Sequence, residues 1–86
     1  MAQVSILYFA SVREAVGLAD ERREMPGAVQ TVGELVDWLA SLEPRYAAAF
    51  AQRQKLRCAV DQVVVSFDAR LDGASEVAFF PPVTGG

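Results

Sequence analysis

The chain begins with a run of residues that is apolar on both phases of a strand. Val4, Ile6 and Tyr8 occupy one phase, and Leu7 and Phe9 occupy the other. A strand with two apolar faces is typical of the middle of a sheet, or of a strand whose second face meets a partner. The pattern therefore predicts a central first strand from Val4 to Phe9.

Two sequences have the spacing of a helix capping box, in which a Ser or Thr precedes a Glu by three residues. Ser11 begins the first, and Gly17 can end a helix of one or two turns there. Thr31 begins the second, after which apolar residues recur at helical spacing until Pro44. The recurring residues are Val32, Leu35, Val36, Leu39 and Leu42. The main helix is predicted here, and a shorter helical piece is predicted over residues 45–52.

Four further segments have strand character. Residues 21–25 are charged and precede Pro-Gly, which favours an exposed edge strand. Residues 56–60 and 63–67 flank the polar pair Asp61-Gln62, which predicts a hairpin. Residues 76–80 form the final strand, which ends at two prolines.

Strands arranged around one amphipathic helix predict an α+β domain, with the helix packed on one face of a mixed sheet. The β-grasp (ubiquitin-like) layout satisfies this pattern, with the first and last strands as central neighbours. We expect one domain over residues 1–80 and an extended tail over residues 81–86. Phe9, Val64 and Phe80 are then left without an internal partner on the second sheet face. An exposed apolar patch of this kind usually marks a protein interface.

Composition excludes several classes of chemistry. The 86 residues contain no histidine, so the chain alone builds no Ser-His-Asp or Cys-His nucleophile and no histidine metal site. The single cysteine, Cys58, cannot form an intramolecular disulfide and is expected to be an inert core thiol. Trp38 is expected to be a partly exposed packing residue on the main helix, and Asp61 a turn residue.

Charge and the N-terminal sequence limit the partners. The net charge of −3 argues against nucleic acid and anionic membranes as partners, and would suit a basic protein partner. The first residues carry no Lys or Arg and have too few apolar residues for a signal sequence or a membrane span. With a single cysteine, these features favour the reducing cytoplasm.

The last six residues are the most informative. They are Pro81, Pro82, Val83, Thr84, Gly85 and Gly86. The prolines end strand pairing and favour an extended chain that reaches roughly 20 Å from the body. Two residues without a Cβ can pass through a channel that side chains would block. The terminal carboxylate is then a substrate for activation as an anhydride with AMP, although a Gly-Gly pair alone can also arise by chance or as a frayed end.

Residues 63–68 and 76–86 resemble the family of small, sulfur-carrier subunits of molybdopterin synthase. Residues 7–10 and 12–14 also match that family's opening, so the resemblance covers essentially the whole chain. The ending Phe-Phe-Pro-Pro-Val-Thr-Gly-Gly is highly specific. Two turns depart from the pattern: Asp61 stands where Asn is usual, and residues 72–75 differ from the family's later Asp-Gly-Asp.

The resemblance implies that Gly86 is adenylated by a ubiquitin-activating-like adenylyltransferase using ATP, and is then converted to a thiocarboxylate. Gly85 permits passage, and residues 81–84 form the threading arm. The loaded tail enters the large subunit of molybdopterin synthase and donates sulfur to cyclic pyranopterin monophosphate, within a heterotetramer. The chain would bind no cofactor permanently and would not be catalytic without its partner.

The resemblance also places Phe9, Val64 and Phe80 at contacts with partner proteins. Two other functions share the Gly-Gly end. One is a ubiquitin-like protein modifier whose Gly86 forms an isopeptide with lysines of target proteins. The other is a sulfur carrier for thiazole or amino-acid synthesis, which would not be expected to have the Phe-Phe-Pro-Pro spacer.

Overall fold

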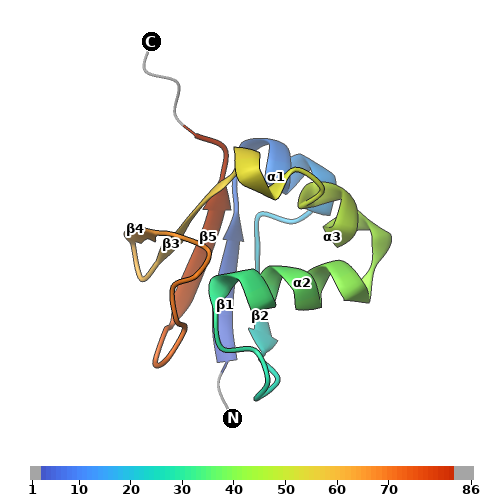
Figure 1. Ribbon diagram of the computed structural model, residues 1–86. Helices are drawn as coiled ribbons and strands as arrows, with labels where there is room; N and C mark the ends of the chain where they lie inside the picture. Colours follow the sequence, from blue (N-terminus) through green and yellow to red (C-terminus); the bar gives the residue numbers. More distant parts are fainter. Residues whose placement is uncertain (1–2, 83–86) are drawn as a thin grey trace.

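The computed structural model describes residues 3–82, which form a five-stranded mixed sheet with its helices gathered on one side (Figure 1). The strands are β1 (Gln3–Tyr8), β2 (Asp20–Glu24), β3 (Arg57–Val60), β4 (Val63–Val65) and β5 (Glu76–Phe80). Their order across the sheet is β2-β1-β5-β3-β4. β1 and β5 run parallel, and the other neighbouring pairs are antiparallel.

The first and last strands are neighbours in the interior of the sheet, as predicted. Ile6 of β1 pairs with Val77 of β5, and Tyr8 pairs with Phe79. All four of these side chains are buried. Each strand therefore contributes one fully apolar face to the core, and its second face lies on the other side of the sheet.

Two predicted strand features are confirmed at the sheet margins. β2 is an edge strand that pairs only with β1, and its charged sequence suits an edge. The hairpin between β3 and β4 turns at Asp61 and Gln62, whose φ angles are 48° and 71°. Positive φ at both central residues is the requirement of a two-residue type I′ turn, which matches the twist of the flanking strands.

Asp61 also joins this turn to the start of β5. Its Oδ1 accepts hydrogen bonds from the backbone N–H groups of Ser75 and Glu76, both at 3.0 Å, and its own N–H donates to the carbonyl of Glu76. An Asn side chain has an acceptor oxygen in the same position. The carboxylate of Asp61 therefore accepts the same two hydrogen bonds that the amide oxygen of an asparagine could accept.

The helix α1 (Ala10–Val16) forms where a helix is predicted, but its predicted capping box is wrong. The helix begins at Ala10, so Phe9 is the N-cap, and no side chain caps it. Ser11 lies inside the first turn, because β1 runs directly into the helix and leaves no room for an earlier cap. Gly17 ends the helix as predicted, with φ of 87° and its N–H donating to the carbonyl of Arg13.

The helix α2 (Val32–Leu42) has the predicted capping box. Thr31 Oγ1 accepts from the N–H of Glu34 at 3.1 Å, and Glu34 Oε1 accepts from the N–H of Thr31 at 3.0 Å. The helical piece predicted over residues 45–52 is divided between α3 (Pro44–Ala49) and the 3₁₀ turn η1 (Arg53–Lys55). The division follows from the burial of Tyr46 and Phe50, which hold the end of α3 against the core.

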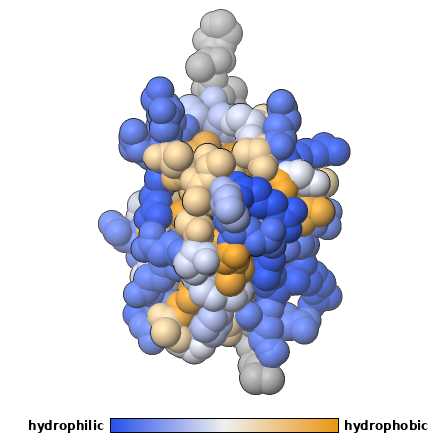
Figure 2. Space-filling view, turned by 90° about the vertical axis from the view of Figure 1, so that its right-hand side faces the viewer, coloured by the Kyte–Doolittle hydropathy of each residue, from blue (hydrophilic) through white to orange (hydrophobic). Residues whose placement is uncertain are grey.

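The core lies between the helices and one face of the sheet. Its aromatic centre is Phe79, whose ring meets that of Phe50 edge-on at 4.9 Å between centroids. Viewed from the helix side, the surface shows a band of apolar residues flanked by hydrophilic ones (Figure 2). With the helices on this side, the other face of the sheet is the open sheet face.

Candidate functional site: the open sheet face and the tail root

The open sheet face carries a row of apolar side chains that crosses four strands. The register places Leu7 beside Ala78, Ala78 beside Ala59, and Ala59 beside Val64. Because side chains alternate along a strand, these residues point away from the face that packs the core. The two alanines are buried but stand apart from the core cluster, since larger neighbours cover them.

A second row lies nearer the end of β5. Phe80 pairs with Arg57, and the N–H of Phe9 donates to the carbonyl of Phe79, which places Phe9 beside Phe80. Phe9 is 47% exposed and Val64 is 66% exposed, although both are apolar. The structure thus brings the three predicted residues Phe9, Val64 and Phe80 to one face, where Phe80 is half-buried.

The sequence prediction missed the other members of this surface. Leu7, Ala59, Ala78 and Arg57 join the predicted residues on the open sheet face because of strand register, which the sequence pattern did not define. The alternating apolar phase of β1 was the one available signal, and it pointed to Leu7. The surface that contains Phe9, Val64 and Phe80 is therefore apolar, and the guanidinium of Arg57 borders it.

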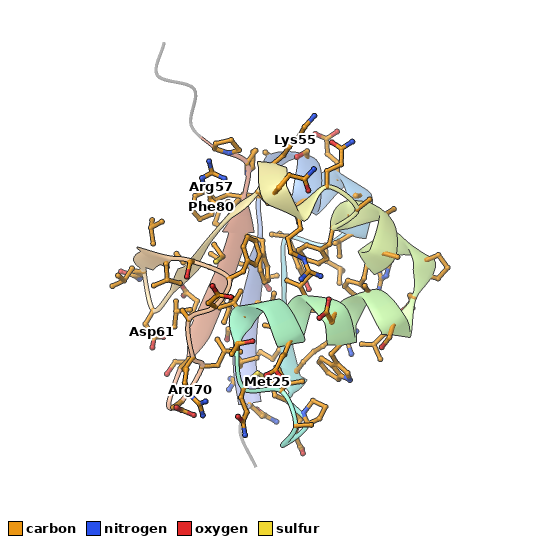
Figure 3. The ribbon with its side chains drawn as sticks, viewed as in Figure 1. Met25, Lys55, Arg57, Asp61, Arg70 and Phe80 are labelled. Atoms are coloured by element: carbon orange, nitrogen blue, oxygen red, sulfur yellow. The ribbon has the colours of Figure 1, made fainter. Side chains whose placement is uncertain are left out.

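The tail root, Pro81 and Pro82, follows β5 directly. Pro81 is half-buried and Pro82 is exposed. Neither has an N–H group to extend the sheet, so strand pairing ends at Phe80. Phe80 and Arg57 lie at this end of the molecule together with Lys55, while Arg70 and Met25 lie toward the other end (Figure 3). The predicted site residues Val83, Thr84, Gly85 and Gly86 lie outside the described residues.

On the helix side of β2, Glu21 is the centre of a polar cluster that the sequence analysis did not predict. Its Oε2 accepts hydrogen bonds from the hydroxyls of Tyr8 at 2.7 Å and Tyr46 at 2.6 Å. Arg23 Nη2 donates to the Tyr46 hydroxyl at 3.0 Å, and Arg23 Nε lies 3.1 Å from Glu21 Oε1. The cluster joins β1, β2 and α3 at the margin of the core.

The cluster changes the acidity of both tyrosines. Burial, and then the hydrogen bond to Glu21, raises the pKa of Tyr8 far above its usual value of 10.0. The same two causes, in the same order, raise the pKa of Tyr46. Both phenols therefore remain neutral donors at physiological pH, which suits a structural role better than acid–base chemistry.

Cys58 and Trp38 have the packing roles predicted for them. The thiol of Cys58 is buried and donates to the carbonyl of Val65 at 3.3 Å, and burial raises its pKa. A buried thiol of raised pKa is a poor nucleophile. Trp38 is half-buried, and the guanidinium of Arg23 lies 5.8 Å from the centroid of its ring.

Two observations concern metals and membranes. Within residues 3–82, no group of three or more Cys, Asp or Glu side chains is arranged to hold a metal ion. None of the helices in that range has the length and apolarity to cross a bilayer, since α2 has 11 residues and a span needs about 20.

Comparison with known proteins gives consistent matches along the whole chain. The model of the ThiS family matches residues 6–86. The Escherichia coli (strain K12) molybdopterin synthase sulfur carrier subunit is 45% identical over 83 residues, covering 96% of this chain and 99% of that protein. The protein of the same name from Mycobacterium tuberculosis is 37% identical over 89 residues, covering 100% of both chains.

Solved structures share the fold. SAMP1 from Haloferax volcanii superposes with a TM-score of 0.72 at 23% identity, covering 99% of this chain and 100% of that one. A putative molybdopterin converting factor, subunit 1, from Pyrococcus furiosus gives a TM-score of 0.70 at 24% identity, covering 96% of this chain and 100% of that one. The predicted α+β, ubiquitin-like β-grasp fold is confirmed by these structures.

Proposed function

Because this chain belongs to the ThiS family, we propose that it is the sulfur-carrier subunit of a molybdopterin synthase. The observation that carries the proposal is 45% identity to a relative of that name, spread over 96% of the chain. The chain ends in the Gly85-Gly86 pair that a terminal carrier requires. No side-chain nucleophile is needed, since the reacting group is the carboxylate of Gly86.

The proposed loading of Gly86 has two steps. The carboxylate attacks the α-phosphate of ATP on an adenylyltransferase related to ubiquitin-activating enzymes, which forms an acyl-adenylate and releases pyrophosphate. Hydrosulfide supplied by a sulfur donor then attacks the acyl carbon: the C–S bond forms as the C–O bond to AMP breaks, AMP leaves, and a thiocarboxylate remains. ATP is a substrate of the activating enzyme in this scheme, and no cofactor stays on the carrier.

The loaded chain then donates its sulfur. In the large subunit of molybdopterin synthase, the thiocarboxylate sulfur bonds to cyclic pyranopterin monophosphate; water then attacks the acyl carbon, the acyl C–S bond breaks, and the carboxylate of Gly86 is regenerated. Two such rounds complete the dithiolene of molybdopterin. The active site belongs to the large subunit, and the carrier is not catalytic on its own.

The residues of the tail suit this route by their chemistry. Pro81 and Pro82 stiffen the chain where it leaves the sheet, and Val83 and Thr84 are β-branched and restricted at χ1. A stiff arm loses less conformational entropy when it enters a channel. Gly85 and Gly86 would lie in the narrowest part, because they have no side chain to obstruct it.

The open sheet face is the proposed contact with partner proteins. Phe9 and Val64 expose apolar area there, and burial of apolar area is the main favourable term in protein association. Phe80 connects this face to the tail root, so one partner can contact both. We place the large subunit on this surface, within a heterotetramer in the cytoplasm, and the adenylyltransferase on the same surface at an earlier step.

The intact mass of the carrier tests the function. After incubation with the activating enzyme, ATP and a sulfur donor, we expect the mass change of one oxygen-to-sulfur exchange at Gly86. Deletion of Gly86, or addition of a glycine after it, is expected to abolish this change and leave the circular dichroism spectrum unchanged. The matched control carries the extra glycine before Met1 and is expected to load normally. Molybdopterin synthesis by the Gly86 deletion would contradict the proposal.

Intact mass and co-purification from cells distinguish the two alternatives. A protein modifier would give lysine-linked conjugates without the sulfur exchange, and a carrier for thiazole or amino-acid synthesis would co-purify with a different large subunit. The fold shared with SAMP1, at 23% identity, does not favour the modifier, because such a likeness extends to the fold alone.

A further inference from the structure

A groove of about 870 Å³ lies beside the tail root. Its walls come from α1, from α3, from the segment between α3 and β3, from the first residue of β3, and from the tail root itself. The lining residues are Ser11, Ala15, Ala48, Ala49, residues 51–52 and 54–57, Pro81 and Pro82. We call it the tail-root groove. The walls from α1 and α3 consist of serine and alanine, whereas the longer side chains come from residues 52 and 54–57.

The tail-root groove has a local charge opposite to that of the whole chain. Lys55 and Arg57 are its two charged lining residues, and no carboxylate lines it. Both cations are exposed, and neither forms an ion pair within residues 3–82. The neighbouring Arg53, by contrast, pairs with Asp37. A chain of net charge −3 thus presents, where its tail begins, two positive charges that have no ion-pair partner among residues 3–82.

The length of the tail limits how far from the groove a protein that receives the tail can lie. Four residues follow Pro82, and a fully extended chain of four residues spans at most about 14 Å. A protein that receives the carboxylate of Gly86 in an internal site must therefore approach the body closely around Pro82. Since Pro81 and Pro82 are part of the groove wall, the receiving protein also meets the groove.

We propose that the tail-root groove receives an acidic segment of the large subunit of molybdopterin synthase, presented beside the opening through which the tail enters. This inference rests on the proposed function. Desolvating Lys55 and Arg57 against a neutral or basic surface would be unfavourable, whereas carboxylates on the partner would pair with both. Arg57 of β3 is also the strand partner of Phe80 in β5, so the groove is continuous with the open sheet face. The partner surface is then apolar opposite the sheet and acidic opposite the groove.

Charge reversal tests the proposal on the full chain. The association rate with the purified large subunit is measured for the wild type and for the double variant Lys55→Glu, Arg57→Glu at two salt concentrations. In low salt we expect the double variant to associate about tenfold more slowly, because complementary charges act mainly on the association rate. In high salt we expect the difference to fall to about twofold or less, because ions screen exposed charges.

Arg13→Glu is the control for charge reversal outside the groove, and it changes the net charge by half as much as the double variant does. It reverses a charge on α1 but lies off the face that carries Ser11 and Ala15, and Arg13 does not line the groove. We expect its association rate to stay within about twofold of the wild type. An equal loss in Arg13→Glu, or no loss in the double variant, would overturn the inference and leave the proposed function standing. Failure of the wild type to bind the large subunit would instead overturn the proposed function.

A second measurement distinguishes the partner from the chain's own tail as the occupant. Side-chain NMR signals of Lys55 and Arg57 are compared between the free full chain and the same chain with its Gly86 carboxylate converted to an amide. Unchanged signals support an occupant on the partner. A shift of both signals would assign the groove to the terminal carboxylate of this chain and overturn the inference.

Discussion

The hydroxyl of Tyr46 donates a hydrogen bond to Oε2 of Glu21 at 2.6 Å, which joins α3 to the edge strand β2. The carboxylate is half-buried, and its other polar contacts come from Tyr8 and Arg23. Edge strands are usually protected by charge that faces water. In this protein one such charge instead faces inward and holds the helix against the sheet.

Removal of the Tyr46 hydroxyl should weaken this connection. We expect Tyr46→Phe to lower the free energy of unfolding by about 1–3 kcal/mol, because the carboxylate of Glu21 and the guanidinium of Arg23 each lose a partner. Urea denaturation measures the change. Tyr8→Phe and the double variant complete a cycle, and non-additive losses are expected because both hydroxyls bind the same oxygen. Losses that simply add would show that the two hydroxyls act independently.

The same cluster predicts how stability depends on alkaline pH. The pKa of Tyr8 and that of Tyr46 are raised in the folded chain, so the unfolded chain loses these phenolic protons first. Stability is therefore fully present below the unfolded value near 10.0 and should fall as the pH rises above it. Absorbance of tyrosinate, followed in native protein and in denaturant, measures the difference. Equal titration curves in the two conditions would contradict the prediction.

Two adjacent valines on β4 allow the open sheet face to be tested with a matched pair. Val64 is 66% exposed on that face, while Val63, 62% exposed, points to the opposite side of the strand. We expect Val64→Asp to weaken binding to the large subunit at least about tenfold, because it places a charge within an apolar contact. Val63→Asp is expected to bind within about twofold of the wild type. Equal weakening by both variants would indicate that the large subunit contacts the edge of β4 and not the open sheet face.

The two capping sequences provide a test of helix stability. Thr31→Ala removes an observed cap and should cost about 1 kcal/mol of the free energy of unfolding. Ser11→Ala removes the same hydroxyl from a residue that caps nothing, so its effect should lie within about 0.5 kcal/mol of zero. Thermal or urea unfolding distinguishes the two. A larger loss in Ser11→Ala would mean that its hydroxyl has a structural role that the fold does not reveal.

These two serine and threonine sites also show what a sequence pattern can and cannot predict. Ser11 and Thr31 have the same three-residue spacing to a glutamate, yet only Thr31 precedes its helix. The difference lies in the preceding chain, since β1 leads straight into α1 whereas a loop leads into α2. Spacing alone does not contain that information.

Features set by local chemistry were predictable, and those set by strand register were not. The turn at Asp61, the end of α1 at Gly17 and the succession of strands and helices along the chain follow from residue types and periodicity. The pairing of Arg57 with Phe80, and the meeting of Tyr46 with Glu21, bring together residues more than 20 positions apart. Glu21 was expected to be an exposed edge charge, because nothing near it in the sequence indicates its two tyrosine partners.

The position of β5 has a consequence for biosynthesis. β5 pairs with β1 on one side and β3 on the other, so it is the strand that joins the β1–β2 pair to the β3–β4 hairpin. It is also translated after every other strand. The sheet therefore cannot be completed until β5 has been synthesised, and a product terminated before β5 would lack the strand that pairs with both β1 and β3. In such a product β1 and β3 would each present an unpaired strand edge, which is a site for aggregation.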